Sequence, residues 1–265
     1  MIILILHAQF FSNCLRKSTE FAAVLPDPVA NGSPKVSSEP GKFRTLYLLH
    51  GYTGNCNDWL LNSKIQELAC LHNLAVIMPS GDNGFYVDNV TGANYGEFTG
   101  KEIVDITRAY LPLSHEREDT LIGGLSMGGF GALRNGLKYS ETFGTIIALS
   151  SALITDQVAK SHGEMKDAPE SKEYYVSVFG DPEKLPNSEN EPKHLARHLK
   201  KSKKPIPKIY MACGTEDFLI QPNRDMHQYL NETGIDVTYV EAPGIHDWNF
   251  WRPQIEAALN WFEKG

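Results

Sequence analysis

The chain has 265 residues, of which 42% are hydrophobic and 22% charged, a composition typical of a globular protein with an ordinary core. Its formal net charge of −7 argues against nucleic acid as a partner. The four cysteines show no C-x-x-C spacing, which argues against a disulfide framework and predicts reduced thiols.

The first segment, MIILILHAQFF (1–11), is apolar but too short to span a bilayer. It also lacks the basic start and small-residue cleavage site of a signal peptide, so we expect a cytoplasmic protein without membrane association. We interpret it as a buried first strand that pairs antiparallel with TEFAAVLP (19–26) at one edge of a sheet. A loop rich in Pro, Gly and Ser follows over residues 26–42.

From residue 45 onward, short apolar runs alternate with segments of helical periodicity. The predicted strands are 45–50, 74–79, 120–126, 145–151, 208–214 and 237–242. The predicted helices are 100–112, 128–140, 223–234 and 252–264. This alternation favours an α/β fold with a mostly parallel central sheet and helices on both faces.

Residues 152–205 interrupt the alternation with a polar, Pro-rich sequence. We interpret them as a small cap-like insertion in a single domain of residues 1–265. In open α/β sheets ligands bind beyond the carboxyl ends of the strands, so an insertion at this point would lie over the active site. The basic run 193–208 within and after it is expected to be a solvated helix end.

The segment TLIGGLSMGGFGAL (120–133) holds a G-x-S-x-G motif between an apolar strand and a helix. In this context the motif predicts a nucleophile elbow with Ser126 at its tip. The turn is so sharp that Gly124 and Gly128 must lack side chains, and the helix N-terminus stabilises negative charge at the serine. The alternative is a glycine-rich turn without chemistry. A P-loop is excluded because no Gly-Lys-Ser/Thr follows.

A nucleophilic serine needs a general base and a carboxylate that orients the base. In this architecture the chain order is serine, acid, histidine. His246 follows the last predicted strand and is the predicted base. Asp217, in the loop after the strand 208–214, is the predicted acid, and Glu216 is the alternative.

Three other histidines, His194, His198 and His227, are not expected to act as the base. His227 falls inside a predicted helix. Asp247 is too close in sequence to His246 to accept from its ring, so it is expected to cap the loop or the following helix. His194 and His198 form an H-x-x-x-H pair without the glutamate of a zincin motif. We therefore expect a helix-surface pair, no metal and no other cofactor.

An oxyanion hole needs two backbone N–H groups directed at the developing charge. The amide of Met127, directly after the serine, is the first candidate. The loop LLHGYTGNCNDW (48–59) follows an early strand and supplies the second, with Tyr52 predicted and Thr53 as the alternative. His50 is expected to shape this loop and not to act as a second base.

These motifs, together with YYVSVFGDPEKL, NEPKHLARHL, CGTEDFL and HDWNFW, resemble the esterase D branch of the α/β-hydrolases. Within it, the chain resembles the tributyrin-esterase-like bacterial carboxylesterases over nearly its whole length. The resemblance implies the α/β-hydrolase fold. It also implies the same nucleophile, acid, base and oxyanion amides: Ser126, Asp217, His246, and Tyr52 with Met127. The loop GIHDWNFW departs from the Asp-His-Ser-Tyr type of motif of the S-formylglutathione hydrolases.

The predicted function is therefore a serine carboxylesterase that hydrolyses short-chain carboxylic esters through an acyl-enzyme. Alternatives are a feruloyl or acetylxylan type of carbohydrate esterase, an S-formylglutathione hydrolase, an acyltransferase, and a non-catalytic binding module. The expected partner is a small-molecule ester, and homo-oligomerisation is left open. Some aromatic side chains are expected to line the substrate pocket or to pack in the core: Trp248, Trp251 and Tyr175 as pocket candidates, with Phe250, Tyr174 and Phe179.

Overall fold

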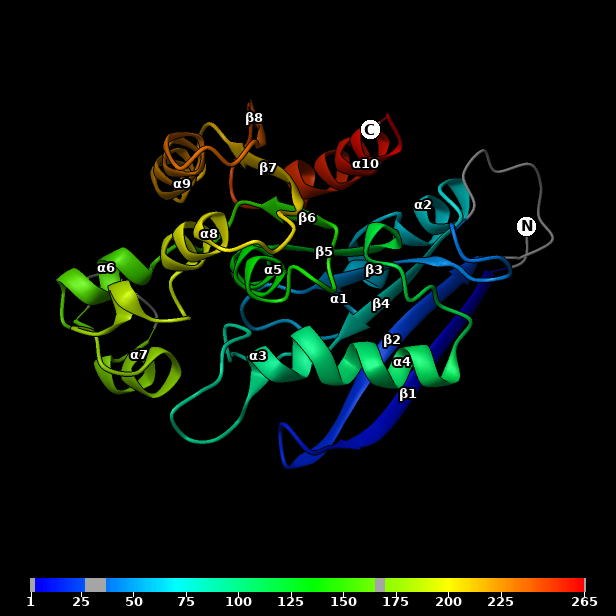
Figure 1. The fold of residues 1–265 in the computed structure, drawn as a ribbon, viewed down its shortest axis with the longest axis horizontal. Helices are drawn as coiled ribbons and strands as arrows, with labels where there is room; N and C mark the ends of the chain where they lie inside the picture. The colour runs from blue at the N-terminus through cyan, green and yellow to red at the C-terminus, as the bar shows by residue number, and fades with distance from the viewer. Residues whose placement is uncertain (1–2, 27–36, 165–169, 265) are drawn as a thin grey trace.

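The computed structural model describes residues 3–26, 37–164 and 170–264, and the strands of these residues form one eight-stranded sheet (Figure 1). The strand order is β1-β2-β4-β3-β5-β6-β7-β8. The pairs β1–β2 and β2–β4 are antiparallel and all other pairs are parallel, which confirms the predicted antiparallel first pair and the mostly parallel sheet. The strands are β1 (Ile3–Ser12), β2 (Lys17–Pro26), β3 (Arg44–Leu49), β4 (Leu74–Pro79), β5 (Thr120–Leu125), β6 (Thr145–Leu149), β7 (Lys208–Gly214) and β8 (Thr238–Ala242).

Helices connect the strands, and none of the described ones is long and apolar enough to cross a bilayer. The last helix begins at Trp248, four residues earlier than predicted, because the Asp247 carboxylate accepts the N–H groups of Asn249 and Phe250 at its start. The helices are α1 (Asp58–Asn62), α2 (Ile65–Leu71), α3 (Tyr95–Glu97), η1 (Phe98–Glu102), α4 (Ile103–Tyr110), η2 (Arg117–Asp119), α5 (Met127–Lys138), α6 (Thr155–Lys160), α7 (Lys172–Phe179), η3 (Leu185–Asn187), α8 (Pro192–Lys201), α9 (Ile220–Glu232) and α10 (Trp248–Lys264).

Two apolar layers sandwich the sheet. In β3, Leu46 and Leu48 pack with α1, α2 and α10 on one face, whereas Tyr47 packs with α4, α5, α8 and α9 on the other. The strands β3, β4, β5 and β6 are buried along their whole length. Their sequences are continuous apolar runs because a parallel sheet covered on both faces has no side in contact with solvent.

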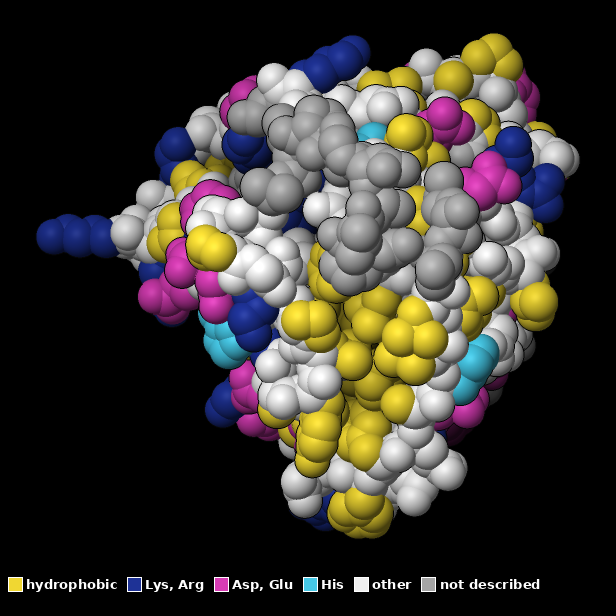
Figure 2. All heavy atoms as spheres, turned by 90° about the vertical axis from the view of Figure 1, so that its right-hand side faces the viewer, with side chains coloured by type: hydrophobic (Ala, Val, Ile, Leu, Met, Phe, Trp, Pro, Cys, Tyr) yellow, Lys and Arg dark blue, Asp and Glu magenta, His cyan; other side chains and the backbone are white. Residues whose placement is uncertain are grey.

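The prediction that the first strand is buried is wrong. β1 pairs antiparallel with β2 at the edge of the sheet, as expected, but it is not buried: Leu4 is 51% and Phe11 63% exposed. Leu6, Ala8 and Phe10 pack against the core, while the alternate side chains face solvent. Hydrophobic side chains gather in a hollow on the side of the molecule where β1 begins and β2 ends (Figure 2).

The segment between β6 and β7 divides into two parts. α8 packs against α5 and α9 and so belongs to the helical layer on the sheet. The basic run 193–208 starts within α8, whose last turn carries His198, Lys200 and Lys201, as expected for a solvated helix end. α6 and α7 lie beyond this layer, at the left of the molecule in Figure 1.

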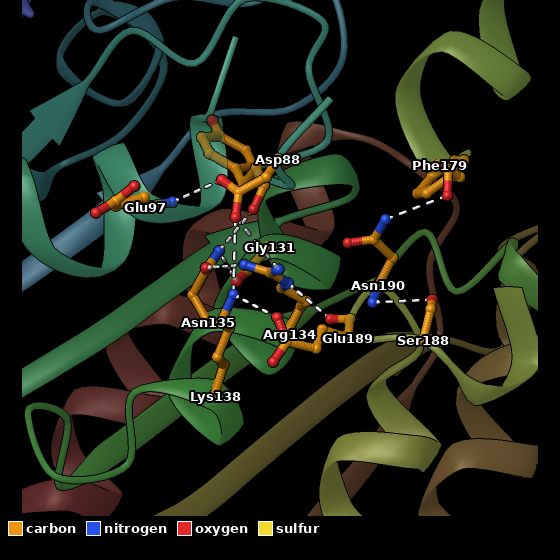
Figure 3. A network of polar contacts seen from close by, with 11 residues as sticks. Asp88, Glu97, Gly131, Arg134, Asn135, Lys138, Phe179, Ser188, Glu189 and Asn190 are labelled. Carbon is orange, nitrogen blue, oxygen red and sulfur yellow. Dashed lines mark hydrogen bonds and ion pairs between the residues drawn. The ribbon is translucent and has the colours of Figure 1, made fainter. Parts of the chain in front are cut away.

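A buried cation ties this segment to the elbow helix. Arg134 of α5 is only 1% exposed and donates to the carbonyl of Glu189 (2.9 Å) and to the Asn135 side chain (2.8 Å). Its guanidinium lies 4.0 Å from the carboxylate of Asp88, which Lys138 also approaches at 3.7 Å (Figure 3). Arg134 therefore holds three separate chain segments together.

We expect Arg134→Leu to lower the free energy of unfolding by about 2–4 kcal/mol, because it removes a buried donor set and leaves the carbonyl of Glu189 without its partner. Urea denaturation measures the loss. Lys138→Met removes a more exposed charge from the same network and is expected to cost at most about 1 kcal/mol. Equal losses in the two variants would contradict the special role of Arg134.

Candidate active site

The turn from β5 into α5 has the geometry of a nucleophile elbow. Ser126 has φ 53° and ψ −118°, a strained conformation for a residue with a side chain. A Cβ on Gly124 would lie 2.5 Å from the backbone of Gly128, and a Cβ on Gly128 would lie 2.5 Å from the carbonyl oxygen of Leu49. Both glycines are therefore required by the close approach of β3, β5 and α5.

We expect Gly128→Ala to lower the free energy of unfolding by more than about 2 kcal/mol, because the contacting atoms are backbone and cannot rotate away. Gly41→Ala is the matched control. Its Cβ would meet no atom within 4 Å, so only its φ of +74° opposes the change, at about 1 kcal/mol. Thermal and urea unfolding compare the two variants. If Gly128→Ala were as stable as the wild type, the close approach of the Leu49 carbonyl to Gly128 would be contradicted.

Three predicted residues come together at this elbow from three different loops. Nδ1 of His246 lies 2.8 Å from Oδ2 of Asp217, and Nε2 lies 2.9 Å from Oγ of Ser126. When Nδ1 carries the ring proton and donates it to Asp217, Nε2 is free to accept from the serine hydroxyl. The order of contacts is that of a nucleophile, a base and an orienting acid.

Asp217 is buried, with 2% of its surface exposed. Burial alone would raise the pKa of Asp217, but hydrogen bonds from His246 and from the N–H of Leu219 outweigh it and leave this pKa below its ordinary value. Asp217 is thus an ionised acceptor at neutral pH. The alternative, Glu216, is turned elsewhere: its carboxylate accepts the N–H of Gly244 at 2.6 Å.

The loop between β3 and α1 (residues 50–57), called the oxyanion loop below, holds the two candidate amides for the second donor, and their hydrogen bonds distinguish them. The N–H of Thr53 donates to Oδ1 of Asn83 at 2.8 Å, so it is already used. The N–H groups of Tyr52 and Met127 have no acceptor among the described residues. Tyr52 lines the cavity at Ser126, and Met127 directly follows Ser126 as the first residue of α5, so both amides are available for an oxyanion.

His50 holds this loop from inside. Its Nε2 accepts the N–H of Gly81 at 2.8 Å, so Nδ1 carries the proton and donates to the carbonyl of Gly51 at 2.7 Å. Burial lowers the pKa of His50, which keeps the ring neutral and suited to accept from an amide. Both ring nitrogens of His50 are therefore occupied by contacts within the loops and are not available as a base for Ser126.

A cavity of about 610 Å³ opens beside Ser126 and His246. The predicted pocket residues Trp248, Trp251 and Tyr175 all line it. Of the other aromatics considered, Phe250 and Phe179 are buried in the core and Tyr174 is half-buried against it. Residues that the sequence reasoning missed also line the cavity, among them Phe85, Ile154 and Phe218.

The insertion contacts the oxyanion loop through polar groups. The hydroxyl of Tyr52 donates to Glu170, and that of Tyr174 donates to the carbonyl of Asn83 at 2.6 Å. Asn83 was also missed, although its sequence context, Gly-Asp-Asn-Gly directly after a strand, is a turn signal at the carboxyl edge of the sheet. The insertion and the loop after β4 therefore both hold the oxyanion loop.

The described residues contain no group of three or more His, Cys, Asp or Glu placed to hold a metal ion. His194 and His198 lie one turn apart on α8, with nearly parallel rings 6.4 Å apart. His227 lies on α9 and stacks on Tyr239, away from Ser126.

The geometry can be compared with known proteins. The model of the family described as "Putative esterase" matches residues 12–262. The chain belongs to this esterase family. The esterase is 48% identical to an acetyl esterase of Caldicellulosiruptor saccharolyticus over 263 residues, which cover 98% of each chain.

Two solved structures from Staphylococcus aureus are also similar to this esterase. A fluorophosphonate-binding serine hydrolase, hydrolase F, is 27% identical over 98% of both chains, with a TM-score of 0.85. An S-formylglutathione hydrolase is 27% identical over 99% of both chains, with a TM-score of 0.83. The family and these neighbours identify an esterase and serine hydrolase with the α/β-hydrolase fold, as predicted.

Proposed function

We propose that this esterase hydrolyses short-chain carboxylic esters, acetate esters above all, through an acyl-enzyme on Ser126. The observation that carries the proposal is the unbroken chain of contacts from Asp217 through His246 to Ser126, beside a cavity. The acetyl esterase at 48% identity supports acetate as the acyl group. The quoted motifs support a place in the esterase D branch, near the tributyrin esterases.

In the first half of the reaction, Oγ of Ser126 attacks the ester carbonyl carbon while its proton passes to Nε2 of His246. The carbonyl oxygen becomes an oxyanion and accepts from the N–H groups of Tyr52 and Met127. When the tetrahedral intermediate collapses, the bond to the alcohol oxygen breaks and Nε2 returns the proton to that oxygen. The alcohol leaves, and Ser126 carries the acyl group.

In the second half, water takes the place of the alcohol. Nε2 of His246 accepts a proton from water as its oxygen attacks the acyl carbon, and the same two amides stabilise the second oxyanion. Collapse breaks the bond to Oγ, which recovers the proton from Nε2. Throughout, Asp217 holds the imidazole and stabilises its charged form.

A second candidate, S-formylglutathione hydrolysis, is favoured by the solved hydrolase of that name at 27% identity. The departure of the loop 244–251 from the motif of such enzymes supports placing it second. Acyl transfer to an alcohol would use the same residues. The thiols of Cys14, Cys56 and Cys213 are free, which supports a reducing compartment such as the cytoplasm.

The test is a substrate series with purified protein: p-nitrophenyl acetate, butyrate and octanoate, methyl ferulate and S-formylglutathione. We expect kcat/KM to fall from acetate to octanoate and both other compounds to be poorer than acetate. A preference for octanoate would contradict the short-chain proposal. A clear preference for S-formylglutathione or methyl ferulate would replace it, and inactivity on all five would overturn ester hydrolysis by this site.

A further inference from the structure

One aromatic side chain at the site is exposed where apolar side chains are usually buried. Phe218 is 76% exposed, although it directly follows Asp217 and lines the cavity beside Ser126. An exposed phenyl ring in a concave site forgoes the burial that normally stabilises it. The proposed mechanism gives Phe218 no role.

The backbone on both sides of Phe218 is fixed. The N–H of Leu219 donates to Oδ1 of Asp217, and the N–H of Ile220 donates to the carbonyl of Asp217. The phenyl ring lies against the imidazole of His246, with ring centroids 4.6 Å apart. The same imidazole meets Trp251 edge-on at 4.9 Å. His246 thus contacts one buried aromatic ring and one exposed ring.

The chemistry of the proposed reaction says which part of a substrate comes to this place. Nε2 of His246 must deliver a proton to the oxygen of the leaving alcohol, so that oxygen must come within hydrogen-bond distance of Nε2. The carbon group attached to it then lies beside the imidazole. The acyl chain, in contrast, extends from the carbon bonded to Ser126.

The cavity that Phe218 lines offers further apolar side chains, next to a polar one, Gln157. Ile154 and Pro222 line the same cavity and are half-buried. Neither these side chains nor Phe218 can form a hydrogen bond with an alcohol rich in hydroxyl groups. A flat or cyclic apolar group can instead stack on the phenyl ring and cover it from water.

We propose that Phe218 is the platform for the leaving alcohol and selects esters whose alcohol carries an apolar ring. This inference rests on the proposed function, which supplies the direction of proton transfer. It also makes acyl transfer testable, because an alcohol that leaves from Phe218 can return to the acyl-enzyme from the same place. Phe218 therefore determines specificity on the alcohol side and not on the acyl side.

The test compares benzyl acetate with methyl acetate, which deliver the same acetyl group, by titration of the acid released. We expect Phe218→Ala to lower kcat/KM for benzyl acetate by at least about tenfold, mainly through KM, and that for methyl acetate by less than about threefold. For Phe218→Leu, kcat/KM for benzyl acetate should lie between the values of the wild type and of Phe218→Ala. In Phe218→Ala, added benzyl alcohol should also capture less of the acyl-enzyme formed from methyl acetate.

Phe11→Ala is the matched control, since Phe11 is 63% exposed on β1 and does not line the cavity. It should leave the ratio of the two kcat/KM values unchanged. An equal fall for both esters in Phe218→Ala would overturn the proposal and assign the ring to positioning His246. A wild-type enzyme that hydrolyses p-nitrophenyl acetate but does not prefer benzyl over methyl acetate would overturn it too. Inactivity on every ester would instead overturn the proposed function.

Discussion

Replacing Ser126 by alanine is expected to lower kcat/KM for p-nitrophenyl acetate by at least about 10⁴-fold, because the proposed mechanism has no other group that can carry the acyl chain. The fold should persist. The elbow is held by backbone hydrogen bonds from Ser126 N–H to Leu149 and from the N–H groups of Phe130 and Ala152 to the Ser126 carbonyl. None of these uses the serine hydroxyl.

Two measurements separate loss of the nucleophile from loss of structure. The melting temperature of Ser126→Ala should stay close to that of the wild type. A fluorophosphonate probe should label the wild type once, on the peptide that contains Ser126, and should not label the variant. Ser188→Ala is the matched control: its hydroxyl donates to the carbonyl of Leu185, and it should keep both activity and labelling. Wild-type activity in Ser126→Ala would refute the whole site.

The core of the fold can be predicted because its signals are local. An apolar run of five to seven residues that alternates with helical segments has few other uses, and β3 to β8 lie where such runs occur. The elbow is similar: Gly124 and Gly128 are dictated by contacts within a few residues of Ser126 and by the adjacent strand. Sequence order then placed Asp217 and His246 at neighbouring strand ends.

What could not be predicted depends on contacts between distant segments. β1 has the composition of a buried strand, but its place at the edge of the sheet leaves one face in solvent. Tyr52 was predicted with Thr53 as the alternative, but what occupies the amide of Thr53 is a hydrogen bond to Asn83, thirty residues away in the sequence, which no local pattern shows. No sequence pattern marks Phe218 as exposed, because its exposure depends on the turn in which the N–H of Leu219 donates to Asp217.

The second large effect is expected for Asp217→Asn, which should lower kcat/KM by about 10³–10⁴-fold. The Asn oxygen can still accept the N–H of Leu219, and its amide then faces Nδ1 of His246 as a donor. Nδ1 must become the acceptor, so the ring proton moves to Nε2. In that tautomer Nε2 cannot take the proton of Ser126.

Glu216→Gln is the matched control, because Glu216 is the neighbouring carboxylate and glutamine keeps an oxygen for the N–H of Gly244. It should change kcat/KM by less than about threefold. The opposite ranking of the two variants would make Glu216 the orienting acid and would contradict the geometry described for His246. Steady-state kinetics on p-nitrophenyl acetate at neutral pH decide between them.

The carboxylate of Asp217 is also expected to make the stability of the fold depend on pH. The pKa of Asp217 is lowered in the folded protein, so the ionised carboxylate stabilises the fold at pH values above its ordinary pKa of about 3.9. This contribution is lost as the pH falls through the folded value. Asp217→Asn should therefore melt below the wild type at pH 7, and the difference should narrow below about pH 4. A difference that stayed constant from pH 7 to pH 3 would show that the charge of Asp217 does not contribute to stability.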